Sequence, residues 1–176
     1  MIDNHYLRMM TRYNKWQNTA VYAAADRLSD ADRRLDRGAF FGTIHATLAH
    51  LLWADRIWMS RFDLGPPPGG SIKDSASFID DWAALTTARH AMDQMMLEWS
   101  DDYAPGAVLG NLDWYSGAAG RNVSAPLGVV LPHIFNHQTH HRGQVHAMLT
   151  AAGCQTADTD LFLMPPADWL GFDPRA

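Results

Sequence analysis

The chain has 176 residues, of which 47% are hydrophobic and 11% aromatic, and it carries a formal net charge of −5 with its nine histidines neutral. This length suits a single domain spanning residues 1–176 with a substantial core. The acidic balance lacks the basic surface that binding to a phosphate backbone needs, so nucleic acid is excluded as the expected partner.

The spacing of apolar residues predicts four long helices. Such residues recur at three- and four-residue intervals, as amphipathic helices require, over about 4–28, 43–62, 75–100 and 127–152. Polar residues that can cap a helix stand near the later three starts: Thr43, then Ser75 or Ser77, then Ser124 ahead of Pro126.

Three connections separate these helices. Ser29 or Asp30 caps a short charged turn, and the proline- and glycine-rich segment 64–71 cannot continue a helix. Segments 108–116 and 121–125 resemble two short strands around a tight turn. The pattern predicts an all-α fold, an antiparallel four-helix bundle with a small β-hairpin before the last long helix. Such bundles build metal sites from side chains on facing helices.

Five of the nine histidines lie within residues 133–146, HIFNHQTHHRGQVH. Histidines four residues apart share one helix face, so His133, His137 and His141 form a ladder. The last two differ by about 40° in direction and by about 6 Å along the axis, so their rings can converge on one ion. Neutral imidazole is a common ligand of transition metals. The alternative is a solvated, histidine-rich face.

The second predicted helix offers the third ligand. His45 and His50 point about 140° apart, so only one of them can face the ladder, and the apolar stripe favours His50. Taken alone, His50 is more simply a hydrogen-bonded core histidine. Three inward histidines without compensating carboxylates are costly to bury unpaired, whereas one shared cation satisfies all three. We therefore predict one divalent transition metal ion held by His50, His137 and His141.

Other residues of the histidine segment receive weaker assignments. Gln144 lies within about 60° of both ladder histidines, so we expect it to line the pocket or to orient a group bound to the metal. His140 lies about 100° off the ladder and is expected to face solvent or a partner. Arg142 is expected to be structural, paired with an acid such as Asp158 or Asp160.

The segment 136–153, NHQTHHRGQVHAMLTAAG, resembles the signature of the DinB/YfiT-like family of metal-dependent proteins. YNKW in the first helix, LAHLLWADRIWMSRF in the second, the late hairpin and the later TDLF extend the resemblance over nearly the whole chain. It implies a helix bundle that binds a divalent metal through three histidines, which fall by position on His50, His137 and His141. The tail 163–176 runs past the usual end of that pattern, and covering the pocket or covering a neighbouring subunit are two open hypotheses for its role.

Three histidines leave coordination positions open for water or substrate. A metal ion there can acidify water, polarise a carbonyl or phosphoryl group, or hold a thiolate. The resemblance implies either hydrolase-like chemistry or transfer of a low-molecular-weight thiol to a small electrophilic substrate. Thiol transfer is favoured because the resemblance includes thiol transferases and because no carboxylate is evident as a base for water. A non-catalytic, metal-binding or stress-response interaction protein is the third alternative. Imidazole suits Zn, Ni, Fe and Cu alike, so the sequence does not identify the metal.

Composition also bears on assembly and location. Trp58, Trp114, Trp169 and the segment Phe162–Met164 are hard to place in one small core, which, with the family resemblance, predicts a homodimer. The single cysteine suits a reducing compartment, and no run approaches the roughly 20 apolar residues of a membrane span. Residues 1–16 lack the apolar core of a signal peptide. We therefore expect a cytoplasmic protein with no membrane partner.

Overall fold

The computed structural model describes residues 2–103 and 108–169 and is mostly helical. The four long helices and the antiparallel hairpin that the sequence predicts are confirmed. No helix within the described ranges is long and apolar enough to cross a membrane. The long elements are α1 (Asn4–Asp26), α3 (Ile44–Arg61), α4 (Trp82–Asp102), β1 (Asn111–Ser116), β2 (Arg121–Pro126) and α5 (Leu127–Ala151). The short elements are α2 (Asp30–Arg33) and the 3-10 helices η1 (Ile72–Ser77), η2 (Leu161–Leu163) and η3 (Pro166–Asp168).

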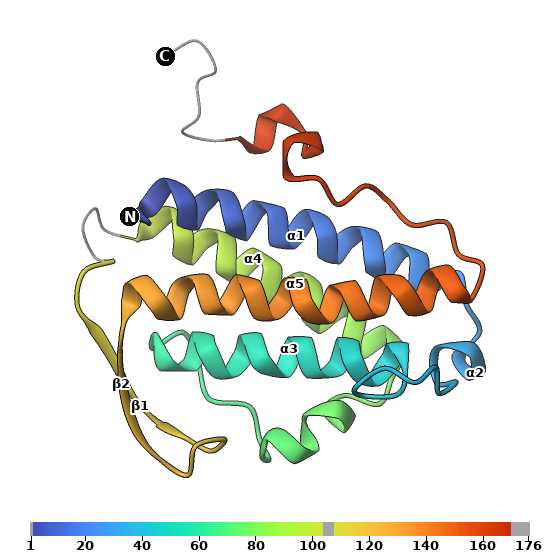
Figure 1. Ribbon diagram of the computed structural model, residues 1–176, viewed down its shortest axis with the longest axis horizontal. Helices are drawn as coiled ribbons and strands as arrows, with labels where there is room; N and C mark the ends of the chain where they lie inside the picture. The colour runs from blue at the N-terminus through green and yellow to red at the C-terminus, as the bar shows by residue number, and fades with distance from the viewer. Residues whose placement is uncertain (1, 104–107, 170–176) are drawn as a thin grey trace.

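The four long helices lie side by side, with α1 against α4 and α5, and α3 against α5 and α4 (Figure 1). The chain direction alternates within the pairs α1–α4 and α3–α5. α3 and α4 run in the same direction, because residues 62–81 return along the outside of α3 before α4 begins (Figure 1). This order differs from the alternation of successive helices that short connections predict. The proline-rich segment inside 62–81 supplies the length for the return.

Two predicted caps are confirmed. Thr43 precedes α3, and its side chain accepts a hydrogen bond from the backbone N–H of Ala46. Ser29 precedes α2 and accepts from the N–H of Asp32. Each side chain pairs one of the backbone donors that a helix start leaves free. The capping residue thus fixes where α3, which carries His50, begins.

The third long helix begins later than the predicted Ser75 or Ser77. Ser71 and Asp74 form a capping box, which folds the intervening chain into the separate 3-10 helix η1. The side chain of Asp81 then caps α4. A local cap therefore outcompetes the apolar pattern that predicts one continuous helix. The consequence is that η1 packs on α3, beside His50.

The fourth long helix does not use the predicted cap at Ser124. That residue lies in β2 opposite Asp113, and its hydroxyl accepts from the side chain of Asn111. β2 runs directly into α5, which has no side-chain cap. The backbone N–H of Leu127 instead donates to the carbonyl of Gly110 at 2.9 Å, so the hairpin itself pairs a donor at the start of α5.

The core joins all four helices through apolar side chains and one buried ionic network. Arg89 of α4 binds Asp55 of α3 at 2.6 Å and Asp93 of its own helix at 2.8 Å. Asp55 accepts from Gln138 of α5, and Asp93 accepts from Asn18 of α1. A buried ion pair is tolerated only when the remaining polar atoms are paired, and this network pairs most of them across four helices. Fully buried apolar residues around it include Leu7, Leu48, Leu52, Met59, Leu85, Met96, Leu131 and Ile134.

Arg142 and the segment after α5 pack against α1. Arg142 donates to the side chains of Asn14 and Asn18 rather than to Asp158 or Asp160, so the predicted ion pair is wrong. The asparagine oxygens on α1 are nearer than either acid and satisfy the buried guanidinium. The chain then runs along α1, where Tyr13 donates to the carbonyl of Thr159 at 2.6 Å.

The described part of the C-terminal tail, residues 163–169, lies beyond α1 in Figure 1 and does not line the cavity described below. The prediction that the tail covers the pocket finds no support in these residues. Residues 170–176 lie outside the described ranges. Any contact of the tail with a neighbouring subunit stays a prediction.

Candidate metal centre

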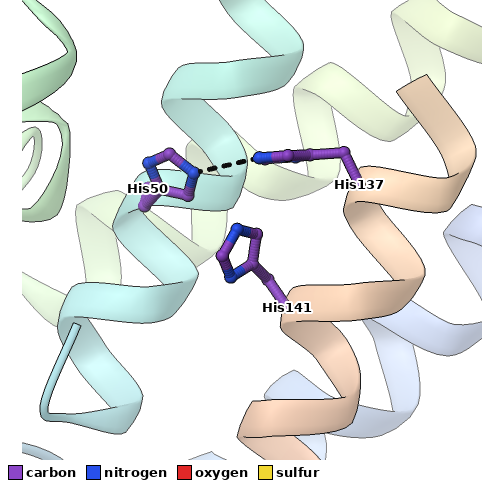
Figure 2. Close-up of side chains that lie close together, drawn as sticks. All are labelled: His50, His137 and His141. Carbon is purple, nitrogen blue, oxygen red and sulfur yellow. Dashed lines mark hydrogen bonds between the residues drawn. The ribbon is translucent and has the colours of Figure 1, made fainter. Parts of the chain in front are cut away.

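Three histidine rings converge between α3 and α5. His50 projects from α3, and His137 and His141 project from successive turns of α5 (Figure 2). Each offers one ring nitrogen, and the three nitrogens all lie within 4.8 Å of one another. The Nε2 atoms of His50 and His137 are 3.3 Å apart. Two nitrogens on one tetrahedral zinc, each about 2.05 Å from it, would stand about 3.3 Å apart, so this spacing fits a single ion.

Neighbouring oxygens fix how two of the rings are protonated. Nδ1 of His50 lies 2.8 Å from the hydroxyl of Ser75, which already donates to the carbonyl of Ile72 at 2.6 Å. The His50 Nδ1 must therefore be the donor. Nδ1 of His141 lies 2.8 Å from the amide oxygen of Gln144, which can only accept. Both rings thus carry their hydrogen on Nδ1, and Nε2 presents the lone pair that a metal ion needs.

Burial keeps these rings neutral. His50 is 3% exposed and His141 is 7% exposed. Burial, and then the neighbouring His141, lowers the pKa of His50 to about 4. Burial and the neighbouring histidines lower the pKa of His137 to about 3, and burial also lowers the pKa of His141. Because metal binding requires neutral imidazole, the three rings are in the binding form at neutral and mildly acidic pH.

An aromatic side chain covers one side of the group. The ring of Phe41 lies 4.1 Å from that of His50 and 5.4 Å from that of His141, measured between centroids. Phe41 is brought there by the turn before α3, in which Gly42 has a φ of 75°, a conformation that residues with a Cβ rarely adopt. Phe41 therefore covers the three-histidine group on the side of His50 and His141.

A cavity of about 820 Å³ opens on the other side, where His50 and His137 form part of its wall. α3, the end of the loop before η1, the β-hairpin and the first turns of α5 enclose it, and its walls are mainly apolar and aromatic. None of the described residues that line it is Asp or Glu. This volume lies within the range of small-molecule pockets, about 300–1,000 Å³. The histidine group can thus be reached by a small organic molecule.

The structure separates the other candidates. Gln144 supports His141 and is not among the described residues that line the cavity, so its contact with a metal-bound group stays a prediction. His45 is buried away from the group, with Nε2 2.9 Å from the carbonyl of Ile79, as its direction on the helix predicts. His140 is exposed. His133 lines the cavity but does not belong to the three-histidine group found among the described residues.

Sequence reasoning missed three residues of this region: Ser75, Phe41 and Arg61. Ser75 was expected to be a helix start, and its contact with His50 arises because η1 packs on α3. Phe41 reaches the histidines from a loop that carries no periodicity. Arg61 lines the far part of the cavity at the end of α3. The sequence marks Ser75 only as a polar residue near a helix start, and Arg61 only as a basic residue near a helix end. Neither signal predicts a place in the site.

The sequence matches the DinB family over residues 1–170. The chain belongs to the DinB family. It is 25% identical over 154 residues to Protein DinB of Bacillus subtilis (strain 168), an alignment that covers 84% of this chain and 87% of that protein. No solved structure is significantly similar to it. The resemblance seen in the sequence is thereby confirmed, and the three convergent histidines give this DinB-family chain a candidate divalent-metal centre.

Proposed function

We propose that this DinB-family chain is a metal-dependent enzyme that activates a low-molecular-weight thiol toward a small electrophilic substrate. The observation that carries the proposal is that two of the three convergent histidines, His50 and His137, form part of the wall of a cavity that is mainly apolar and aromatic. A closed structural site would have a fourth protein ligand, whereas three histidines leave a position for a reactant.

A divalent ion held by His50, His137 and His141 would supply a Lewis acid that lowers the pKa of a thiol or of water. The chain's own residues prepare this site. Ser75 and Gln144 orient two of the rings, and Phe41 screens one side from water. On the other side, the mainly apolar and aromatic walls of the cavity favour an apolar reactant.

Thiol transfer is preferred to hydrolysis because of what the cavity wall lacks. Hydrolysis benefits from a general base positioned to take a proton from water, and no Asp or Glu is present among the described lining residues. A thiol is acidic enough to ionise near a cation without such a base. Metal-dependent hydrolysis and a non-catalytic binding role are the alternatives that the experiment below separates.

Two finer statements belong to the same proposal. The four long helices are taken to form a four-helix bundle around the metal centre, with its ligands on the facing helices α3 and α5. The cytoplasm is the proposed location, since a reducing compartment suits both a thiol substrate and a chain with one cysteine.

The test compares the wild type with His50→Ala, His137→Ala and His141→Ala, each purified without an affinity tag. Elemental analysis should find one divalent transition ion per wild-type chain and strong loss in each variant. Common thiols are then supplied with generic electrophiles, and separately ester, amide and phosphoester substrates. We expect kcat/KM for thiol transfer to fall by at least about 100-fold in His137→Ala, because a Lewis acid contributes several kcal/mol to a transition state.

His140→Ala is the matched control, since this exposed neighbour of His141 should keep both metal and activity. Ester, amide or phosphoester turnover that needs His137, without thiol transfer, would establish the hydrolase alternative. Absence of any turnover at full metal occupancy would favour the non-catalytic role. Metal retained by His137→Ala but lost by His140→Ala would overturn the ligand assignment.

A further inference from the structure

An arginine that has no acidic partner among residues 2–103 and 108–169 lines the cavity at a distance from the histidines. Arg61 is the last residue of α3, and it lines the same cavity as His50 and His137. His50 precedes it by three turns, which corresponds to about 16 Å along the helix axis. The cavity therefore connects the candidate metal centre to a cation at the other end of α3.

The guanidinium of Arg61 lies close to two indole rings of the cavity wall. Its central carbon lies 4.2 Å from the ring centroid of Trp58 and 5.3 Å from that of Trp114. Within the described part of the chain, Arg61 makes no ion pair and its side-chain N–H groups have no hydrogen-bond partner. Contact with the indole π-systems does not use up the N–H donors of the guanidinium, so these donors remain available for a ligand.

A cation of this kind is poorly compensated. Burial lowers the pKa of Arg61 to about 10, so the group is still charged at neutral pH. The same charge helps to lower the pKa of His133, after burial, which places His133 within its electrostatic reach. Contact with indole rings offsets only part of the cost of burying such a cation. A purely structural role in clamping the two tryptophans would not require a cavity at its edge.

We propose that Arg61 binds the carboxylate or phosphate of an elongated organic substrate whose reacting group lies at His50 and His137. The assignment of the reacting end rests on the proposed function, whereas the binding of the oxyanion by Arg61 does not. Arginine matches an oxyanion through two parallel N–H donors. The apolar walls between the two ends accept a hydrocarbon or aromatic middle section.

The charges around the cavity agree with an anionic ligand. The other Lys or Arg among its described lining residues is Lys73, which is exposed on η1. No carboxylate of the described lining competes with the ligand for Arg61. A wall with cations and without acids attracts an anion and repels a cationic analogue.

The proposal is tested by binding in solution, with phenylhexanoate, its uncharged amide and phenylbutyl phosphate as probes. Calorimetry is done with metal-loaded protein and with protein stripped by a chelator. We expect the wild type to bind the acid at least about tenfold more tightly than the amide, since a charge-assisted hydrogen bond contributes about 1.5–3 kcal/mol. Arg61→Met keeps the apolar stem of the side chain. It should abolish this preference while the Kd of the amide changes by less than about twofold.

Lys73→Met is the matched control, and its preference for the acid should stay within about threefold of the wild type because an exposed charge contributes little. Arg61→Gln provides a second uncharged variant if Arg61→Met does not fold. The phosphate arm shows which oxyanion binds more tightly. An equal affinity for acid and amide in the wild type overturns the proposal.

The proposal is also overturned if the preference for the acid over the amide survives in Arg61→Met but disappears on metal removal or in His137→Ala. In that case the oxyanion binds at the histidines. Binding to metal-stripped protein requires neither metal nor turnover. The oxyanion-binding result is therefore independent of whether the protein catalyses thiol transfer. A failure of oxyanion binding likewise does not affect the metal-content test of the proposed function.

Discussion

His50 and His141 are both anchored through Nδ1, although their partners come from different elements. Ser75 lies on η1, whereas Gln144 lies one turn beyond His141 on α5. Each of these hydrogen bonds fixes the tautomer of the ring and restricts its rotation, so the ring loses less conformational entropy when it binds an ion. Of the two, Ser75 is fully buried, and its hydroxyl has its own hydrogen committed to the carbonyl of Ile72.

Replacing Ser75 with Ala should therefore weaken metal binding. The expected loss of affinity is about 10- to 100-fold, since His50 then has no acceptor for its Nδ1 hydrogen. Competition with a chromogenic chelator measures it. Ser77→Ala is the matched control, because Ser77 is exposed on the same 3-10 helix and contacts no histidine ring. An equal loss in both variants would mean that η1 as a whole, rather than the Ser75 hydroxyl, is responsible.

The buried histidines also predict how the metal-free protein responds to pH. Burial first, and then neighbouring histidines, lowers the pKa of His50 to about 4 and of His137 to about 3, whereas an unfolded histidine titrates near 6.5. Below about pH 6.5 the unfolded chain takes up protons that the folded chain does not, so the free energy of unfolding decreases as the pH falls toward 4.

Urea unfolding between about pH 7 and pH 5, with chelator present, should show this decrease in the wild type. His137→Ala should show a smaller one, because the group that resists protonation is gone. His140→Ala should behave like the wild type. The same slope in His137→Ala and wild type would contradict the assignment of the effect to the half-buried His137 ring.

At the residue scale, the convergence of the three histidines was predictable, whereas the residues that contact them were not. His137 and His141 follow from helical periodicity, and His50 follows from the apolar face of its own helix. Ser75, Phe41 and Arg61 matter because of contacts between segments distant in the sequence or because of a cavity. Periodicity within one segment carries no information about such contacts.

The boundaries of the elements show where local capping overrides apolar spacing. The apolar pattern from Phe78 onward continues into α4, but the Ser71–Asp74 capping box and Asp81 divide that stretch into η1 and α4. At α5 the hairpin performs the role that a side-chain cap was expected to have. The apolar pattern predicted that these helices exist, and hydrogen bonds that depend on the tertiary fold decided where they start.

The buried network around Arg89 links the long helices, so its disruption should be costly. Arg89→Met removes the cation between Asp55 and Asp93, whose side chains are 1% and 3% exposed. Leaving two buried carboxylates without their partner should reduce the free energy of unfolding by about 3–5 kcal/mol. Chemical denaturation measures the change.

Arg34→Met serves as the comparison, since Arg34 pairs with the exposed Asp30 and Asp80. Surface pairs contribute about 0–1 kcal/mol, so this variant should stay close to the wild type. If the two variants lost similar stability, the network would not be the main link between the helices.

At the scale of the whole molecule, the path of the chain decides which helices face each other. Residues 62–81 return along α3, so α4 runs in the same direction as α3 and pairs antiparallel with α1 (Figure 1). This leaves α5 free to pack antiparallel on α3, which brings His137 and His141 opposite His50 (Figure 2). The sequence predicted four helices and their inward faces, but the direction of α4 depends on the course of a long connection.

We also propose that the chain self-associates, for a narrower reason than the sequence offered. Trp58 is buried and packs on Trp114 within the chain, so these two no longer require a partner. The exposed apolar residues of η2 remain, with Phe162 69% and Leu163 47% exposed side by side. Apolar side chains grouped on a surface commonly mark an interface. Light scattering at micromolar concentration should give twice the chain mass of 19.6 kDa.

Phe162→Ser should shift this equilibrium toward the monomer, because it removes the largest exposed apolar group of η2. Phe40→Ser is the matched control: Phe40 is 78% exposed but lies in the turn before α3, beside the histidines rather than on the tail. A monomer in the wild type would refute the dimer. A dimer lost in Phe40→Ser but kept in Phe162→Ser would instead place the interface at the histidine end, where a neighbouring copy would cover the Phe41 side of the metal centre.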